Sequence, residues 1–154
     1  EGLRSLVLPV PEEGVHDAWI ALMGAATGRL RLSPQPLIQY RQHSSNQIGA
    51  KRRSIIARMK RPGTNRIRES MDVISQYEQA IERLRRVSTL GNSAELLREF
   101  TNKAEHVRNR ISVQVRGHGW LKLMLSEIVH GRYHRYSVGW WSVGNDLLGG
   151  SLDS

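Results

Sequence analysis

Apolar residues in the second half of the chain recur at helical spacing. Two stripes step by three and four residues, Ile74, Tyr77, Ile81 and Leu84, then Leu97, Phe100, Ala104, Val107 and Ile111. This periodicity predicts two amphipathic helices, over 70–90 and 94–115. The link between them holds Gly91, which suits a helix end, and Asn92 with Glu95, which suit a capping box. So short a link predicts an antiparallel hairpin that packs through the two stripes.

Helical character continues after the hairpin. The Gly117-His118-Gly119 sequence ends it, and residues 120–129 form a short apolar run. Residues 132–148 then carry five apolar or aromatic side chains at helical spacing, namely Tyr133, Tyr136, Trp140, Val143 and Leu147. We therefore predict about four helices between residues 52 and 148.

The first 50 residues are patterned differently and hold four of the five prolines. Leu6-Val7-Leu8, followed by two prolines, predicts a brief extended segment. A helix is expected to begin near Val15–Asp17, because four apolar residues then recur at helical spacing: Trp19, Leu22, Met23 and Ala26. Alternation after Gly28 predicts two short strands, near 29–32 and 37–42.

The patterns divide the chain into two parts. Residues 1–50 are expected to form one helix and two short strands, and residues 51–154 a basic helical tail. The predicted fold class is mainly α.

Positive charge follows the same division. The formal net charge is +9, and residues 1–50 contribute none of it. Residues 51–68 contain eight Lys and Arg, with no acidic and no aromatic residue. A solvated helix face, an anionic membrane surface and a phosphate-bearing ligand all remain open for this run. Nucleic acid is disfavoured, because aromatic stacking platforms and known binding motifs are missing.

Other features limit the class of protein. With no cysteine, disulfides, cysteine-ligated zinc and iron–sulfur clusters are excluded, which fits a reducing compartment. The apolar runs are much shorter than the roughly 20 residues of a membrane span. The chain starts without Met, so we expect an internal cut. We expect a cytoplasmic location, and the basic run further suggests a peripheral position at the inner face of the membrane.

Two groups of polar residues are candidates for chemistry. His16 and Asp17 stand at the start of the first predicted helix, where an acidic residue by itself favours simple capping. Arg41, His43 and Asn46 follow the second predicted strand. Arg offers bidentate donors to phosphate and a neutral His can ligate a metal ion, although a polar loop explains this composition equally simply.

Together the two groups form a longer pattern, Pro9-x-Pro11-Glu12, His16-Asp17-Ala18-Trp19, Gly28 and Pro36-Leu37-Ile38-Gln39-Tyr40-Arg41-Gln42-His43-x-x-Asn46-x-x-Gly49-Ala50. It resembles the C-terminal end of the catalytic domain in glycosyltransferase family 2, in the branch of rhamnosyltransferase-like enzymes. The resemblance covers roughly residues 6–50. It implies a GT-A fold that transfers a sugar from a nucleotide-sugar donor to a saccharide or lipid-linked acceptor in bacterial polysaccharide assembly.

The resemblance also implies roles for single residues. Asp17 matches the catalytic base that takes the acceptor hydroxyl proton, with His16 beside it. His43 matches the histidine that helps to hold the divalent cation, Mg²⁺ or Mn²⁺, on the donor diphosphate. Arg41 and Asn46 match positions that face the same pocket, where they contact phosphate or acceptor.

A complete GT-A domain also has a preceding nucleotide-binding half with a DxD motif, and this chain contains no DxD. We therefore expect the chain alone to be inactive. We further expect apolar surface around Trp19, Leu22 and Leu37 to be uncovered, which predicts a homo-oligomer. The alternative is a helical module, built from residues 51–154, that has no catalysis and uses the basic run 51–68 to bind a protein partner or an anionic membrane surface.

Overall fold

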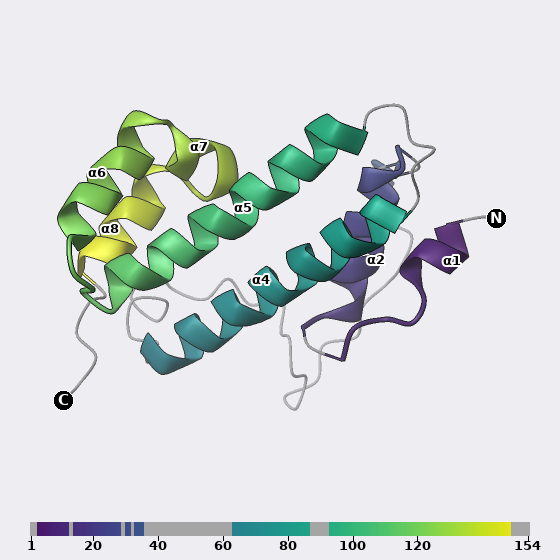
Figure 1. Cartoon of the computed structure of the whole chain (residues 1–154), viewed down its shortest axis with the longest axis horizontal. Helices are drawn as coiled ribbons and strands as arrows, with labels where there is room; N and C mark the ends of the chain where they lie inside the picture. Colours follow the sequence, from purple (N-terminus) through teal and green to yellow (C-terminus); the bar gives the residue numbers. More distant parts are fainter. Residues whose placement is uncertain are drawn as a thin grey trace.

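The structure, a computed structural model, describes residues 3–12, 14–28, 30–31, 33–35, 63–86 and 93–148. All regular structure in these residues is helical (Figure 1): α1 (Leu3–Val7), α2 (His16–Ala26), α4 (Gly63–Arg86), α5 (Ser93–Gln114), α6 (Trp120–Val129), α7 (Arg132–Tyr136) and α8 (Trp140–Leu148). The prediction of a mainly α chain is confirmed for the described residues.

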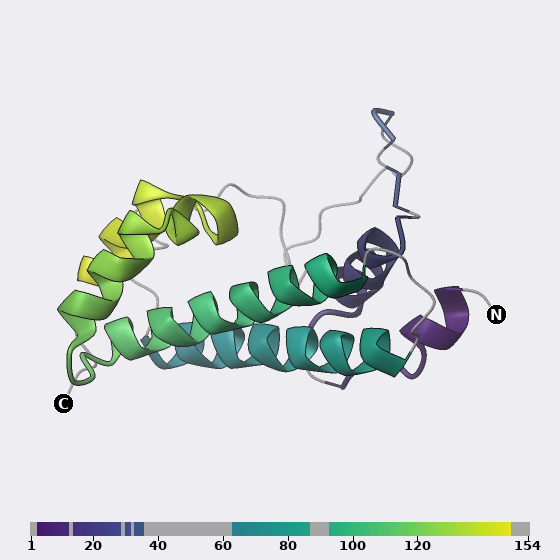
Figure 2. The same ribbon diagram turned by 45° about the horizontal axis from the view of Figure 1, so that its top comes forward.

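The two longest helices, α4 and α5, lie side by side and run in opposite directions (Figures 1 and 2). The predicted stripes supply buried Ile81 and Leu84 on α4 and buried Phe100, Ala104 and Val107 on α5. Ala80, which lies outside the predicted stripe, is buried beside them. Tyr77 meets Phe100 edge to face, with ring centroids 5.2 Å apart. The hairpin is confirmed, although α4 begins at Gly63 and so includes the end of the basic run.

Helices α1 and α2 pack at the end of the hairpin where α4 finishes and α5 begins. Val7, Trp19 and Met23 share one apolar cluster with α4 and α5. Trp19 is fully buried and Leu22 is half-buried, so the prediction of uncovered surface at Trp19 is wrong. Leu37 lies outside the described residues. The Trp19 patch therefore gives no argument for a homo-oligomer.

The prediction of an extended segment before the first prolines is wrong. Leu3–Val7 is a helix rather than an extended run, and the N–H of Leu8 donates to the carbonyl of Arg4 at 3.0 Å. The prolines that follow can end a helix as well as a strand, because proline lacks the N–H that either element needs. The local pattern was therefore compatible with both elements.

The described residues contain no strand. Leu30 and Arg31, which belong to the strand predicted at 29–32, are irregular and exposed. Alternation alone cannot hold a strand, because its backbone groups need a partner strand to bond with. The strand predicted at 37–42 lies outside the described residues.

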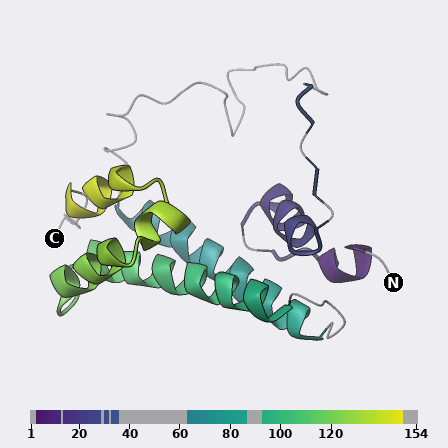
Figure 3. The same cartoon turned by 90° about the horizontal axis from the view of Figure 1, so that it is seen from above.

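Helices α6, α7 and α8 fold back onto the second half of α5 (Figure 3). Val113, Met124, Tyr133 and Val143 form a second apolar cluster there. The helical spacing over 132–148 is interrupted between α7 and α8, where Gly139 takes a positive φ of 54°. None of the described helices is both long enough and apolar enough to cross a membrane.

Candidate functional site

His16 and Asp17 occupy the first turn of α2, after an N-cap position taken by Val15. Nε2 of His16 lies 2.8 Å from Oδ1 of Asp17, and the two side chains are 73% and 81% exposed. Val15 has no side-chain acceptor for the backbone N–H groups of the first turn of α2, so this helix has no side-chain cap. The Asp17 carboxylate pairs with the His16 imidazole instead. The carboxylate complements the helix dipole and otherwise faces solvent, where a substrate hydroxyl can reach it.

The start of α2 is held in place by Trp19. Its indole N–H donates to the carbonyl of Val7 at 2.9 Å, and the Arg83 guanidinium lies 4.8 Å from its ring centre. A buried aromatic ring with a satisfied N–H and a cation on its face is a rigid anchor. His16 and Asp17 therefore lie on a helix, α2, that is anchored to the rest of the fold.

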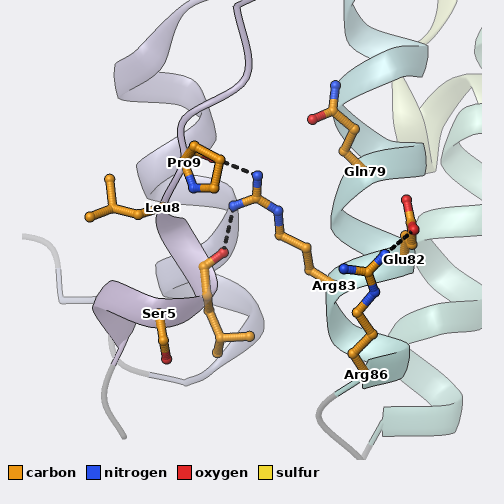
Figure 4. A pocket seen from close by; sticks show the side chains of 8 residues that line it. Ser5, Leu8, Pro9, Gln79, Glu82, Arg83 and Arg86 are labelled. Carbon is orange, nitrogen blue, oxygen red and sulfur yellow. Dashed lines mark hydrogen bonds and ion pairs between the residues drawn. The ribbon is translucent and has the colours of Figure 1, made fainter.

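Arg83 ties α4 to the end of α1 and to the segment that follows it (Figure 4). It donates to the carbonyls of Leu6 at 3.0 Å, Val7 at 2.9 Å and Pro9 at 2.5 Å. A pocket of about 370 Å³ lies here, lined by Ser5, Leu6, Leu8, Pro9, Gln79, Glu82, Arg83 and Arg86. Its arginines are engaged, Arg83 with carbonyls and Arg86 with Glu82. Because His16 and Asp17 do not line it, the pocket is a feature separate from the candidate pair.

Arg41, His43 and Asn46 lie outside the described residues. Their distances to Asp17 therefore stay a prediction. Among the residues that the structure describes, no group of three or more His, Asp or Glu side chains is placed to hold a metal ion.

A second group of polar side chains is buried between α5 and the last three helices. Glu127 of α6 lies 2.5 Å from Nδ1 of His106 and accepts hydrogen bonds from Asn109 at 2.9 Å and Arg132 at 3.0 Å. Burial raises the pKa of Glu127, but these hydrogen bonds and the charge of Arg132 outweigh it, so the pKa lies below its ordinary value. The buried carboxyl group is held ionised.

Asp146 of α8 is the second buried carboxylate, with no exposed surface. Arg110 binds both of its oxygens, at 2.7 and 2.9 Å, while Gln114 and Tyr133 donate at 2.7 and 2.9 Å. Burial, followed by the charge of Asp146, raises the pKa of the Tyr133 hydroxyl far above its ordinary value. The Tyr133 hydroxyl therefore stays protonated and donates a hydrogen bond to the carboxylate.

Ser137 joins the two halves of this network. Its hydroxyl lies 2.8 Å from Nε2 of His106 and accepts from Arg110 at 3.2 Å. The order Ser137, His106, Glu127 is that of a nucleophile, base and carboxylate, but the imidazole has no exposed surface and is enclosed by aromatic rings. The network therefore holds α5, α6, α7 and α8 together, which is a structural role.

The sequence contained a signal for this network that periodicity in apolar residues did not reveal. His106, Arg110 and Gln114 are spaced four residues apart along α5 and so share a helix face. Their partners Glu127 and Asp146 are the only acidic residues between 106 and 148. When a polar stripe on one helix is followed by only two acidic residues, those two are the available partners for its basic side chains. This pattern therefore indicates specific ion pairs between α5 and the later helices.

Comparison of the chain with protein-family models, curated proteins and solved structures gave no match.

Proposed function

We propose that the chain is the C-terminal portion of a family 2 glycosyltransferase that moves a sugar from a nucleotide-sugar donor to a saccharide or lipid-linked acceptor. The pattern over residues 6–50 supports this proposal. The observation that carries it is the environment of Asp17, a carboxylate in the first turn of a fixed helix, 81% exposed and paired with His16. Such a group is free to accept a proton from a substrate.

In the proposed reaction, Asp17 takes the proton of the acceptor hydroxyl. The hydroxyl oxygen bonds to the anomeric carbon of the donor sugar while the bond from that carbon to the diphosphate breaks. His16, at 2.8 Å, positions the carboxylate, and Arg41 and Asn46 contact phosphate or acceptor. Anchoring at Trp19 keeps the base at a defined place, which lowers the entropic cost of attack.

His43 is the proposed protein ligand of a divalent cation, Mg²⁺ or Mn²⁺. A neutral imidazole nitrogen is chemically suited to bind a metal ion, but one imidazole is a partial ligand set. The proposal therefore includes a preceding nucleotide-binding half whose DxD carboxylates complete it, and without that half we expect no transfer. When bound, the cation stabilises negative charge on the departing diphosphate.

The test uses a polypeptide in which such a nucleotide-binding half precedes this chain. Asp17→Asn should abolish nearly all sugar transfer and leave donor affinity unchanged, because deprotonation matters only as the transition state is reached. His43→Ala should instead weaken metal-dependent donor binding. The control is Glu95→Gln, which changes an exposed carboxylate in the first turn of α5, outside the pattern, and should retain full activity. Normal transfer by Asp17→Asn would return that residue to a structural role.

A further inference from the structure

A small pocket lies where α4, α5 and α7 meet, and α5 runs between the other two helices (Figures 1 and 2). The pocket holds about 240 Å³ and has three aromatic and three charged side chains in its wall: Tyr77, Phe100, Tyr136, Glu99, Lys103 and Arg135. This volume is below the about 300–1,000 Å³ of sites for drug-sized ligands. The size and the aromatic wall suit a small, flat and largely apolar molecule.

The ion pair in this pocket leaves the Lys103 amine without a carboxylate partner. Arg135 engages both oxygens of Glu99, with Nη2 2.8 Å from Oε1 and Nε donating to Oε2 at 3.0 Å. The Tyr136 hydroxyl donates to the same Oε2 at 2.9 Å. Within the described ranges, no carboxylate is paired with Lys103, whose Nζ donates instead to the main-chain carbonyl of Tyr136. The amine is therefore bonded to a neutral acceptor.

The surroundings of Lys103 favour its uncharged form. The side chain is half-buried. Burial, followed by the positive charge of Arg110 on the same helix, lowers the pKa of the Lys103 amine. A lysine that is desolvated or lies near another cation is a stronger nucleophile, because a larger share of it carries a free electron pair. The bond to Tyr136 uses one N–H and leaves that electron pair available.

We infer that Lys103 captures small aldehydes with a flat apolar body in this pocket, as an imine. The amine nitrogen attacks the carbonyl carbon, so an N–C bond forms as the C=O π bond opens. The carbonyl oxygen then leaves as water with both amine protons, and no oxidant or reductant is needed. The rings of Tyr77, Phe100 and Tyr136 supply the apolar contact to the body of the aldehyde. The inference does not depend on the role of Asp17.

The charges in the pocket favour an aldehyde over an anion. Of the two cations in the wall, Arg135 is already engaged by Glu99. A phosphate or carboxylate would therefore meet one half-buried amine with the Glu99 carboxylate nearby, which is a poor anion site. An aldehyde carries no charge and uses the features that the pocket has, a nucleophilic amine and aromatic walls.

The test treats the full chain with salicylaldehyde and sodium cyanoborohydride, which reduces an imine to a stable secondary amine. Peptide mapping by mass spectrometry then gives the label at each of the four lysines, Lys51, Lys60, Lys103 and Lys122. At about pH 7 we expect labelling at least about tenfold faster at Lys103 than at the exposed Lys122. Labelling at Lys103 should also saturate with aldehyde and be slowed by 2-hydroxybenzyl alcohol, an unreactive analogue. Labelling at Lys122 should rise linearly and ignore the alcohol.

Two variants separate the pocket from general amine reactivity. Lys103→Met keeps a long unbranched side chain and should lose the saturable label. The control Lys122→Arg changes the exposed lysine and should keep that label. Circular dichroism checks that both variants keep their helices.

Two results with the wild-type chain would overturn the inference, whether or not the variants fold. One is equal labelling rates at Lys103 and Lys122, which would make Lys103 a structural residue that bonds the last carbonyl of α7. The other is labelling at Lys103 that rises linearly with aldehyde and is unaffected by the alcohol. Because labelling is measured without donor or acceptor sugar, its failure is distinct from failure of the transferase proposal.

Discussion

Among single residues, Asp146 carries the largest predicted effect on stability. Replacing it with Ala leaves the Arg110 guanidinium partly buried without its bidentate partner. Breaking a buried ion pair in this way costs about 3–5 kcal/mol. We expect a loss of that size in urea unfolding. Tyr133→Phe removes one hydrogen bond to the same carboxylate and should cost about 1 kcal/mol. Equal effects of the two changes would contradict the assigned network.

Glu127 gives a prediction about pH. Its pKa is lower in the folded chain than the ordinary value of 4.5, so its stabilising contribution is present above that value and is lost as pH falls through the folded pKa. Glu127→Gln should cost about 1.5–3 kcal/mol at neutral pH, because hydrogen bonds to a charged group are lost. The difference from wild type in unfolding free energy should shrink as the pH falls below 4.5 and through the folded pKa. A difference that does not change with pH would show that ionised Glu127 is not stabilised.

Among elements, the hairpin of α4 and α5 supplies much of the core. Leu84 is 1% exposed, so Leu84→Ala should cost about 2–5 kcal/mol in thermal or urea unfolding. Met71, on the same helix but 57% exposed, provides the control, and Met71→Ala should change stability by less than about 0.5 kcal/mol. Leu97 is half-buried, so Leu97→Ala falls between these limits. A small effect at Leu84 would show that the hairpin packs through another face.

The break between α7 and α8 gives a matched pair of glycine substitutions. Gly139 has a φ of +54°, and an added Cβ would lie 2.7 Å from the His134 ring. Gly139→Ala should therefore destabilise the chain by about 1–2 kcal/mol. Gly144 lies inside α8 with open space around it, so Gly144→Ala should stabilise by about 0.5–1 kcal/mol. Thermal unfolding should shift in opposite directions, and a shift in the same direction would contradict this geometry.

Elements with long, regular patterns could be predicted from the sequence, and short ones could not. The stripes of α4 and α5 fix their period over several turns, so the hairpin and its core residues follow from spacing. The segments at 3–7 and 29–32 hold too few residues to define a period. The interruption at Gly139 depends on a single backbone angle and on packing against His134, neither of which appears in an apolar pattern.

For the whole molecule, the limits of prediction are set by contacts between distant residues. The expectation of an uncovered Trp19 rests on the sheet that the family resemblance implies, whereas in the structure Arg83 and the α4–α5 core cover this ring. The network around His106 joins residues from four helices, so its members were invisible in any one segment. The placement of His16 and Asp17 at a helix start, in contrast, needs only local sequence and was predicted.

The proposed role of Asp17 is that of the catalytic base of a glycosyltransferase. It is tested most directly by the rate of one round of sugar transfer at saturating donor, with the nucleotide-binding half present. We predict that Asp17→Asn slows this step by about 10²–10⁴-fold, while Asp17→Glu, which keeps the carboxylate, retains more of the rate. Donor affinity should be the same in both variants. A rate for Asp17→Asn within about twofold of wild type would contradict the claim.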